Sequence, residues 1–547
     1  MKKSGKFIKI ISVALVAAML SLTGCGEDEV YVKPNYVEVP GTLVEPTGYQ
    51  GPKESYMIYY GVLNAEIIEM AKHYEVVILH PRMGNITRSQ VKELQDSGCI
   101  VLGYISIGED LRTYGYTPET MLEDARFTAD GSGPRVDPRA AGDVTLDNVA
   151  LTGKASDGGS GYASFYLDDN DHDGKPDINV NFGCAFTNIG DPAWYDTLNE
   201  MMFDGADGIP GIREILTTDY GRGLGCDGLF LDTIDTAAPN AYTADTDANK
   251  TRYEWTAPGV LEFCKRLKND YSDKKILQNR GMFMFNSALP MFKYNPREYI
   301  DYLLVESYRL DSNQTTAYID SYFRDNKYNY APRIMAEAGR SDGFEVLSLG
   351  YAEGPAEEEL LDTLLGYSEV GMDILMEDIY EAQEVVGYKH YITDGSVTVV
   401  NDFVITHDNK SDETAPVWTS VYNDHNVWPP EEPTPREGIQ EIEAIQGGVI
   451  VRYDVALDKN KVVYTLYYQE QPFDFENNPN LEGAEAVVLD PLVGDGYDHY
   501  APDVYPNQSE VTGLNSGTQY YFVLRASDNT SLHNEEKNEN VKTATPQ

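Results

Sequence analysis

Short apolar runs alternate with helix-like stretches from Tyr56 to about residue 380, a pattern that is typical of parallel β/α folds. The predicted strands are the runs Tyr56–Tyr60, Val76–Leu79, Ile100–Ile105, Leu229–Leu231, Lys275–Leu277, Tyr302–Val305, Arg333–Ala336 and Asp373–Met376. The predicted helices are Ala65–His73, the stretch from Thr87 to Gly98, Thr256–Tyr271, Thr315–Asn326 and Ala356–Gly371. Eight strands that alternate with helices predict an α/β fold of the (β/α)8 TIM-barrel type over residues 53–400. An open doubly wound sheet is the alternative, but no glycine-rich dinucleotide fingerprint follows the first strand.

A long insertion, at about residues 107–225, separates the third predicted strand from the fourth. It leaves from the carboxyl end of a strand, so we expect it to lie over the face on which β/α barrels build their active sites. Its content of glycine, aspartate and aromatic residues indicates ordered loops more than helix.

The pattern changes after a proline-rich linker at residues 401–438. Alternating apolar and polar positions then predict the strands Gly448–Tyr453, Val462–Tyr468, Ala486–Leu489 and Tyr520–Ala526. Because no helical periodicity appears in residues 439–547, we expect them to form a small all-β sandwich.

The first 25 residues have the organisation of an export signal. Four lysines precede the apolar run Ile10–Leu22, which is too short for an ordinary membrane span, and Leu22-Thr23-Gly24-Cys25 follows. This order resembles a bacterial lipoprotein signal, which implies that Cys25 is lipidated and that residues 26–52 are a tether. We therefore expect an exported protein that is lipid-anchored at the bacterial cell surface. A plain secretory signal and a short signal anchor are the alternatives.

The formal charge of −47 makes nucleic acid and anionic lipid poor partners, so the lipid anchor is the one membrane contact that we expect. A cationic or neutral substrate suits this field better, although simple solubility would explain the charge equally well. The four cysteines after Cys25 match no zinc motif, and Cys99 and Cys226 are expected to be buried beside strands. We expect a monomer.

Polar residues follow several of the predicted strands. Asp232 ends the run Leu229–Leu231, Glu306 follows Val305, and Asn279 follows the fifth strand. A barrel places these strand ends on one rim, and two acids held close together are what glycoside hydrolysis requires. The alternative for Asp232 is a cap of the following helix or loop. His80 follows the second strand, but a lone histidine is more often structural, and no Ser-His-Asp order or metal cluster competes with the acids.

Residues 56–380 resemble glycoside hydrolase family 114, the endo-α-1,4-polygalactosaminidase-like barrels. The matching segments are Tyr59-Tyr60-Gly61, Gly103-Tyr104-Ile105-Ser106-Ile107-Gly108-Glu109, Asp227-Gly228-Leu229-Phe230-Leu231-Asp232-Thr233-Ile234-Asp235, Asn279-Arg280-Gly281 and Val305-Glu306-Ser307. The long insertion is a departure from the family pattern. It affects the prediction of the substrate more than the prediction of the reaction.

The resemblance implies an Asp/Glu catalytic pair, which falls on Asp232 and Glu306, with Asp235 as a rival for the first role. We expect Asp232, at the end of a buried strand, to be the nucleophile and Glu306 to be the acid/base. It implies that substrate-binding residues lie among Tyr59, Tyr104, Glu109, Asp235, Asn279 and Arg280. The family's substrate is a partly deacetylated, α-1,4-linked galactosamine polymer, cleaved at internal bonds without a catalytic cofactor. The alternative is a non-catalytic carbohydrate-binding surface lipoprotein.

Residues 513–526 resemble the late-strand motif of fibronectin type III domains, in which Leu514 would fill the core and Tyr520 would form a corner hydrogen bond. We expect this module to act as a spacer or contact domain.

The insertion contains Asp169-Asn170-Asp171-His172-Asp173-Gly174-Lys175-Pro176-Asp177, which resembles a calcium loop. Its expected ligands are Asp169, Asp171, Asp173 and Asp177 with the carbonyl oxygen of Lys175. The glutamate of a full EF-hand is absent, because Val180 stands at position twelve. The alternative is an acidic turn without a metal.

Overall fold

The computed structural model describes residues 53, 55–83, 86–129, 151, 156, 158–168, 173–180, 182–235, 249–285, 296–311, 323–352, 358–408, 412–419, 434–490 and 506–547. The predicted signal, Cys25 and the tether lie outside these residues. Within the described ranges, no helix combines the length and the apolar character needed to cross a bilayer.

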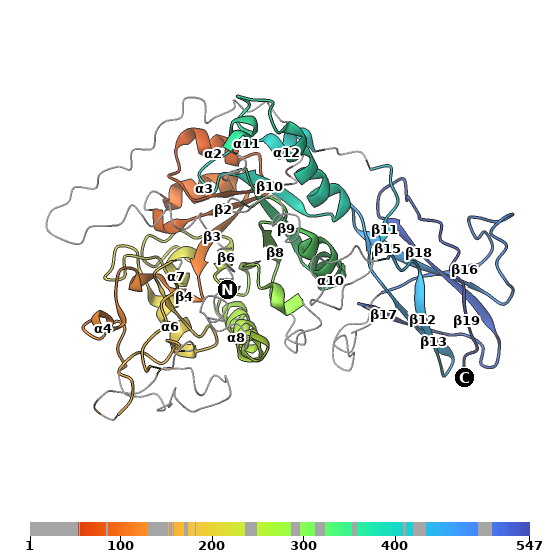
Figure 1. Ribbon diagram of the computed structural model, residues 1–547, viewed down its shortest axis with the longest axis horizontal. Helices are drawn as coiled ribbons and strands as arrows, with labels where there is room; N and C mark the ends of the chain where they lie inside the picture. The colour runs from red at the N-terminus through yellow and green to blue at the C-terminus, as the bar shows by residue number, and fades with distance from the viewer. Residues whose placement is uncertain are drawn as a thin grey trace, which may run out of the picture.

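An eight-stranded parallel sheet forms the first domain (Figure 1). Its strands are β1 (Tyr56–Tyr59), β2 (Val76–Leu79), β3 (Ile100–Ser106), β6 (Gly228–Asp232), β7 (Lys275–Asn279), β8 (Tyr302–Glu306), β9 (Glu345–Tyr351) and β10 (Lys389–Thr393). They are hydrogen-bonded in this order, and every pairing is parallel. Because β1 also lies against β10, the sheet curls into a nearly closed barrel. The predicted (β/α)8 architecture is confirmed.

Helices connect the strands and cover the outside of the barrel. They are α2 (Ala65–Ala71), α3 (Arg88–Asp96), α8 (Asn249–Asp270), α10 (Ala331–Ala338), α11 (Glu358–Leu364), α12 (Met372–Ile379) and α13 (Phe403–His407). The predicted start of α3 is confirmed in detail. Thr87 and Gln90 form a capping box, in which each side chain bonds the backbone of the other residue.

The last two strands differ from the sequence prediction. The segment Arg333–Ala336 lies in α10, and Asp373–Met376 lies in α12. The true strands, β9 and β10, carry the buried polar residues Ser348 and His390. These residues interrupt the apolar runs, so the apolar pattern did not predict the two strands. In α12 the buried positions 378 and 379 lie three and four residues after the buried position 375, which is the helical period.

The insertion packs against the carboxyl ends of β3 and β6. It contains the antiparallel pair β4 (Glu109–Asp110) and β5 (Ala185–Phe186) and the helices α4 (Pro118–Met121), α6 (Pro192–Glu200) and α7 (Ile212–Leu216). The fully buried Trp194 of α6 donates a hydrogen bond from Nε1 to the carbonyl oxygen of Ile107, at 2.7 Å. The insertion is therefore part of the domain core, and in its described part loops outnumber helical residues, as the composition indicated.

The C-terminal region is an all-β sandwich, as predicted. A three-stranded sheet contains β12 (Ile439–Ile445), β13 (Gly448–Tyr453) and β17 (Asn507–Thr512), and a four-stranded sheet contains β16 (Glu485–Val488), β15 (Val462–Gln469), β18 (Tyr520–Asp528) and β19 (Lys542–Ala544). A short ribbon of β11 (Val417–Trp418) and β14 (Ala456–Leu457) lies beside them. Leu514 is buried, and the hydroxyl of Tyr520 accepts a hydrogen bond from the amide of Asn515 at 3.3 Å. The likeness to fibronectin type III domains stays a prediction.

Candidate active site

Three neighbouring strands end in polar residues that contact one another. Asp232 ends β6, Asn279 ends β7 and Glu306 ends β8. The amide Nδ2 of Asn279 donates both to Oδ1 of Asp232, at 2.8 Å, and to Oε2 of Glu306, at 2.7 Å. The two facing carboxylate oxygens are therefore no further apart than the sum of these distances, 5.5 Å. The barrel rim brings together the two acids that the sequence analysis selected as a pair.

Each acid also has a tyrosine of its own. The hydroxyl of Tyr104 donates to Oδ2 of Asp232 at 2.7 Å, and the hydroxyl of Tyr351 donates to Oε1 of Glu306 at 2.6 Å. Burial, together with the charge of the neighbouring carboxylate, raises the pKa of both tyrosines well above the usual value. Both hydroxyls therefore remain hydrogen-bond donors at any physiological pH. Every oxygen of the two carboxylates accepts a hydrogen bond, and this fixes their orientation.

Asp232 has a perturbed pKa. Removal of its carboxylate from bulk water and the nearby charge of Glu306 raise the pKa of Asp232 to about 6, although Asn279 and Tyr104 act in the opposite direction. Asp232 therefore gains a proton in the mildly acidic range. A carboxylate whose pKa lies near the working pH is suited to reactions that need one ionised acid and one protonated acid.

The backbone turns sharply after each of these three residues. The next residues, Thr233, Arg280 and Ser307, have φ values of 64°, 56° and 55°, in the left-handed region that residues other than glycine seldom adopt. For the β-branched Thr233 this conformation is unusual, and its Oγ1 is held by hydrogen bonds from the amide of Gly108 and with Ser106, each at 2.8 Å. Backbone strain of this kind concentrates at functional sites. Its repetition at the ends of three adjacent strands makes this rim the candidate active site.

Arg280 holds the rival aspartate. Its Nε donates to Oδ2 of Asp235 at 3.0 Å, and its Nη1 donates to the carbonyl oxygen of Glu306 at 2.7 Å. Asp235 therefore belongs to an ion pair at the edge of the site. Asp232, by contrast, shares the amide of Asn279 with Glu306.

The remaining predicted binding residues lie in different environments. Glu109, on β4, is fully buried, and its Oε1 accepts a hydrogen bond from Nδ2 of Asn179 at 2.7 Å. The hydroxyl of Tyr59 donates to the carbonyl oxygen of Val62 at 3.2 Å. The ring of the next residue, Tyr60, packs edge-on against Tyr104, with a centroid distance of 5.3 Å. Substrate-binding roles for Tyr59 and Glu109 stay predictions.

Two site residues were missed by the sequence reasoning. Tyr351 is the last residue of β9, a strand that the apolar pattern did not predict, so no strand end pointed to it. Tyr60 directly follows Tyr59, and consecutive residues of an extended chain face opposite sides. Tyr60 could have been found from its position in the strand, because Tyr56, Ile58 and Tyr60 alternate and therefore share one face of the first predicted strand.

A second hydrogen-bonded cluster joins Ser348 on β9, His390 on β10 and Asp378 on α12. Oγ of Ser348 lies 2.8 Å from Nδ1 of His390, and Nε2 of His390 lies 2.8 Å from Oδ2 of Asp378. These are the residue types of a serine-hydrolase triad, but all three are 0 % exposed. A nucleophile that no substrate can reach does no chemistry, so this cluster is a buried polar network that ties the barrel wall to α12.

The predicted calcium loop is covered only in part. Asp169 and Asp171 lie outside the described residues. The Lys175 ammonium forms ion pairs with Glu119 at 3.0 Å and with Asp173 at 3.1 Å, and Asp177 is buried. In the described ranges no three His, Cys, Asp or Glu side chains are grouped to hold a metal ion. A calcium ion bound by the whole loop stays a prediction.

Comparison with known proteins gives structural matches alone. No family model matches the chain, and no curated sequence matches it. The glycoside hydrolase domain of PelA from Pseudomonas aeruginosa matches with a TM-score of 0.36 and 13% identity, over 64% of this chain and 98% of that one. The galactosamine complex of Ega3 from Aspergillus fumigatus matches with a TM-score of 0.31 and 12% identity, over 65% and 97% of the two chains. Trehalose-6-phosphate hydrolase from Bacillus licheniformis has a TM-score of 0.31 and 10% identity, over 62% and 64%. Likeness at this level identifies neither a family nor a substrate, so a functional assignment depends on the site itself.

Proposed function

We propose that this chain is a glycoside hydrolase that cleaves internal bonds of an amino-sugar polysaccharide with Asp232 and Glu306. The observation that supports the proposal is the shared amide of Asn279, which holds one oxygen of each acid within 5.5 Å of the other. Retaining glycosidases hold their two carboxyl groups about 5–5.5 Å apart, whereas inverting enzymes need about 6.5–9.5 Å. The spacing therefore favours retention.

In the proposed reaction Glu306 protonates the glycosidic oxygen while Asp232 attacks the anomeric carbon. The bond to the leaving sugar breaks and a covalent glycosyl ester forms on Asp232. Glu306 then removes a proton from a water molecule, which attacks the anomeric carbon and releases Asp232 as a carboxylate. With a pKa of about 6, Asp232 is mostly ionised at neutral pH, as a nucleophile must be. Tyr104 and Asn279 keep its carboxylate in place through both steps.

The choice of an amino sugar rests on the resemblance of the strand-end motifs to the polygalactosaminidase-like barrels, and the acidic charge of −47 would favour a chain with free amino groups. We further propose that the enzyme is exported and lipid-anchored through Cys25. The alternative from another class is a carbohydrate-binding surface lipoprotein without activity. The strained turns and the fully hydrogen-bonded acid pair favour the enzyme, because a binding site needs neither.

Incubation with partly deacetylated α-1,4-linked galactosamine polymer tests the proposal. We expect mass spectrometry to detect internal fragments of several lengths with the wild-type chain, and none with Asp232→Asn. Intact polymer after incubation with wild-type protein, together with measurable binding of that polymer, would establish the binding-protein alternative.

A further inference from the structure

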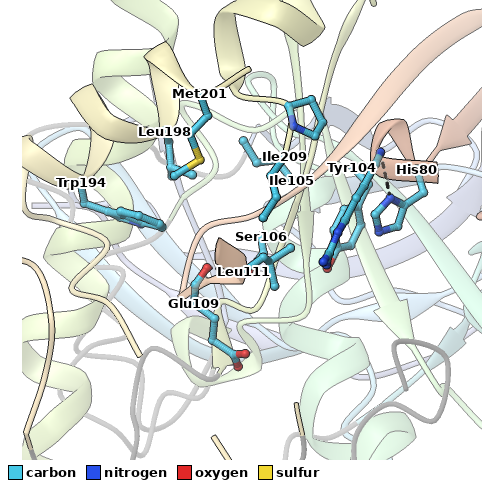
Figure 2. A pocket seen from close by; sticks show the side chains of 12 residues that line it. His80, Tyr104, Ile105, Ser106, Glu109, Leu111, Trp194, Leu198, Met201 and Ile209 are labelled. Atoms are coloured by element: carbon cyan, nitrogen blue, oxygen red, sulfur yellow. Dashed lines mark hydrogen bonds between the residues drawn. The ribbon is translucent and has the colours of Figure 1, made fainter. Parts of the chain in front are cut away.

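Two parts of the chain pack against the barrel at different places (Figure 1). The insertion lies at the carboxyl ends of β3 and β6, and Figure 2 shows Trp194 and Leu198 of its helix α6 on one side of a small pocket, with Tyr104 of the barrel on the other. Arg82 lines the same pocket. The C-terminal sandwich packs instead against the side of the barrel that α10 covers, where β14 contacts this helix.

The barrel and the sandwich share the segment around β14. Val455 and Leu457 are 2% and 8% exposed, and both belong to the apolar core of the barrel. Ala456, between them, belongs to the core of the sandwich. Consecutive residues of an extended chain face opposite sides, so this short strand has one face in each core. The two domains are therefore joined by apolar packing as well as by the chain itself.

A buried arginine also connects the two domains. Arg340, two residues after α10, is 3% exposed, and its Nη2 donates to the carbonyl oxygen of Pro506 in the sandwich at 3.0 Å. Its guanidinium pairs with Glu337 of α10 at 3.3 Å. Loss of an acceptor from a buried charged group is costly, so this contact favours the docked arrangement.

A second set of contacts joins the sandwich to the π-helical turn η9 (Tyr380–Val385). Nζ of Lys459 donates to Oε1 of Glu384 in η9 at 2.5 Å and to Oδ1 of Asp408, which follows α13, at 2.8 Å. At Gly387, which has a φ of 76°, an added Cβ would lie 2.4 Å from the carbonyl oxygen of Asp458. The two backbones thus approach each other too closely for any side chain at this position.

These contacts lie on the segments that lead into the last two strands of the barrel. Helix α10 precedes β9, and η9 precedes β10. Within the described residues, β10 lies against β1 without the strand ladder that joins the other neighbouring strands, so the barrel has its least backbone support here. Strand β9 also carries Tyr351, which donates to Glu306.

We propose that the C-terminal sandwich stabilises the closing strands of the barrel, and that the two domains unfold as one cooperative unit. Domains that meet only through a small polar interface move relative to each other, whereas a shared apolar core couples them. The sandwich is then part of the folded unit that holds Tyr351 and Glu306, rather than a spacer. This inference goes beyond the proposed function, because it concerns the folded state and not the substrate.

Hydrogen–deuterium exchange of the full chain tests the inference by comparing amides of β9 and β10 with amides of β15 and β18. Leu466→Ala removes a fully buried side chain from the core of the sandwich. We expect the slowest amides of both domains to exchange about 30-fold faster or more, by factors that agree within about threefold. The matched control is Leu532→Ala in the sandwich, where Leu532 is 63% exposed, and it should leave both domains unchanged.

Lys459→Met tests the interface itself. We expect exchange in β10 and in the sandwich to rise about threefold or more, because Glu384 and Asp408 lose the cation between them. Acceleration confined to the sandwich with either variant would show that the barrel is stable without it and would overturn the inference.

Calorimetry of the wild-type chain decides the question if Leu466→Ala does not fold. A single transition whose calorimetric and van't Hoff enthalpies agree supports one cooperative unit, and two transitions refute it. These measurements do not use catalysis, so a failure of the proposed function would leave their outcome unaffected.

Discussion

The barrel carries two polar clusters built from residue types that enzymes use, and they differ in access. At the rim, Asp232, Asn279 and Glu306 lie at strand ends, where both acids are partly exposed. Within the wall, Ser348, His390 and Asp378 are also connected by hydrogen bonds of normal length, but none of them is exposed. Judged by residue types and hydrogen bonds alone, the buried cluster would be the stronger candidate for a catalytic site than the rim cluster. The two clusters differ in solvent exposure and in backbone strain. The rim cluster is open to a substrate and is followed by strained turns, whereas the buried cluster can only stabilise the fold.

The largest effects should come from the acids at the rim. Asp232→Asn and Glu306→Gln are each expected to fold and to lose about 10³-fold or more in kcat on the polymer, because each removes a carboxylate that the reaction consumes or regenerates. Asp235→Asn is the matched variant, and it should lose far less, since Asp235 pairs with Arg280 rather than with Glu306. If Asp235→Asn is inactive while Asp232→Asn still turns over, the assignment of the nucleophile is wrong.

Asn279→Ala should have the next largest effect. It removes the amide that fixes the spacing of the two acids, so we expect kcat to fall about 10- to 100-fold while the fold is retained. The acidic limb of the pH–rate profile should move as well, since the Asn279 amide lowers the pKa of Asp232. An unchanged profile would show that the amide does not set the geometry of the pair.

The buried cluster should respond in stability rather than in rate. Ser348→Ala leaves Nδ1 of His390 without a partner in the core, and it is expected to lower the free energy of unfolding by about 1–3 kcal/mol. Denaturant titration measures this loss. The kcat of the folded variant should stay within about twofold of the wild type. A loss of kcat comparable to that of the rim variants would mean that the buried cluster takes part in catalysis.

The smallest effect concerns the pH dependence of stability. Because the pKa of Asp232 is raised from 3.8 to about 6, its protonated form suits the folded state, and this contribution is lost as the pH rises through 6. Asp232→Asn, which mimics the protonated acid, should therefore change stability little at pH 4 and increase it at pH 7.5, by on the order of 1–3 kcal/mol. Unfolding curves at the two pH values measure the difference. An equal shift at both would mean that the Asp232 carboxylate is not destabilised by its surroundings.

The sequence was informative where apolar runs ended on polar residues. Six strands, from β1 to β8, were predicted at their places, and three of them carried Asp232, Asn279 and Glu306 to the rim. The same rule failed for β9 and β10, because the buried network places Ser348 and His390 inside strands that the rule expects to be apolar. Because β9 was not predicted, Tyr351 at its end was not identified as a site residue.

Other parts of the site depend on contacts between distant segments. Arg82 precedes the long insertion and Trp194 lies within it, and no local pattern places them in one pocket. The left-handed turns at Thr233, Arg280 and Ser307 are equally hidden, since none of these residues is glycine. Tertiary structure imposes these features against local preference.

Trapping of the covalent intermediate tests the central claim most directly. An activated 2-deoxy-2-fluoro glycoside of the galacto series should inactivate the wild-type chain, and peptide mapping should place the sugar on Asp232. The account predicts that this label is absent from Asp232→Asn and that it still forms in Glu306→Gln, because an activated leaving group does not need the acid. A label on Glu306 or Asp235, or hydrolysis with inversion and no label, would contradict it.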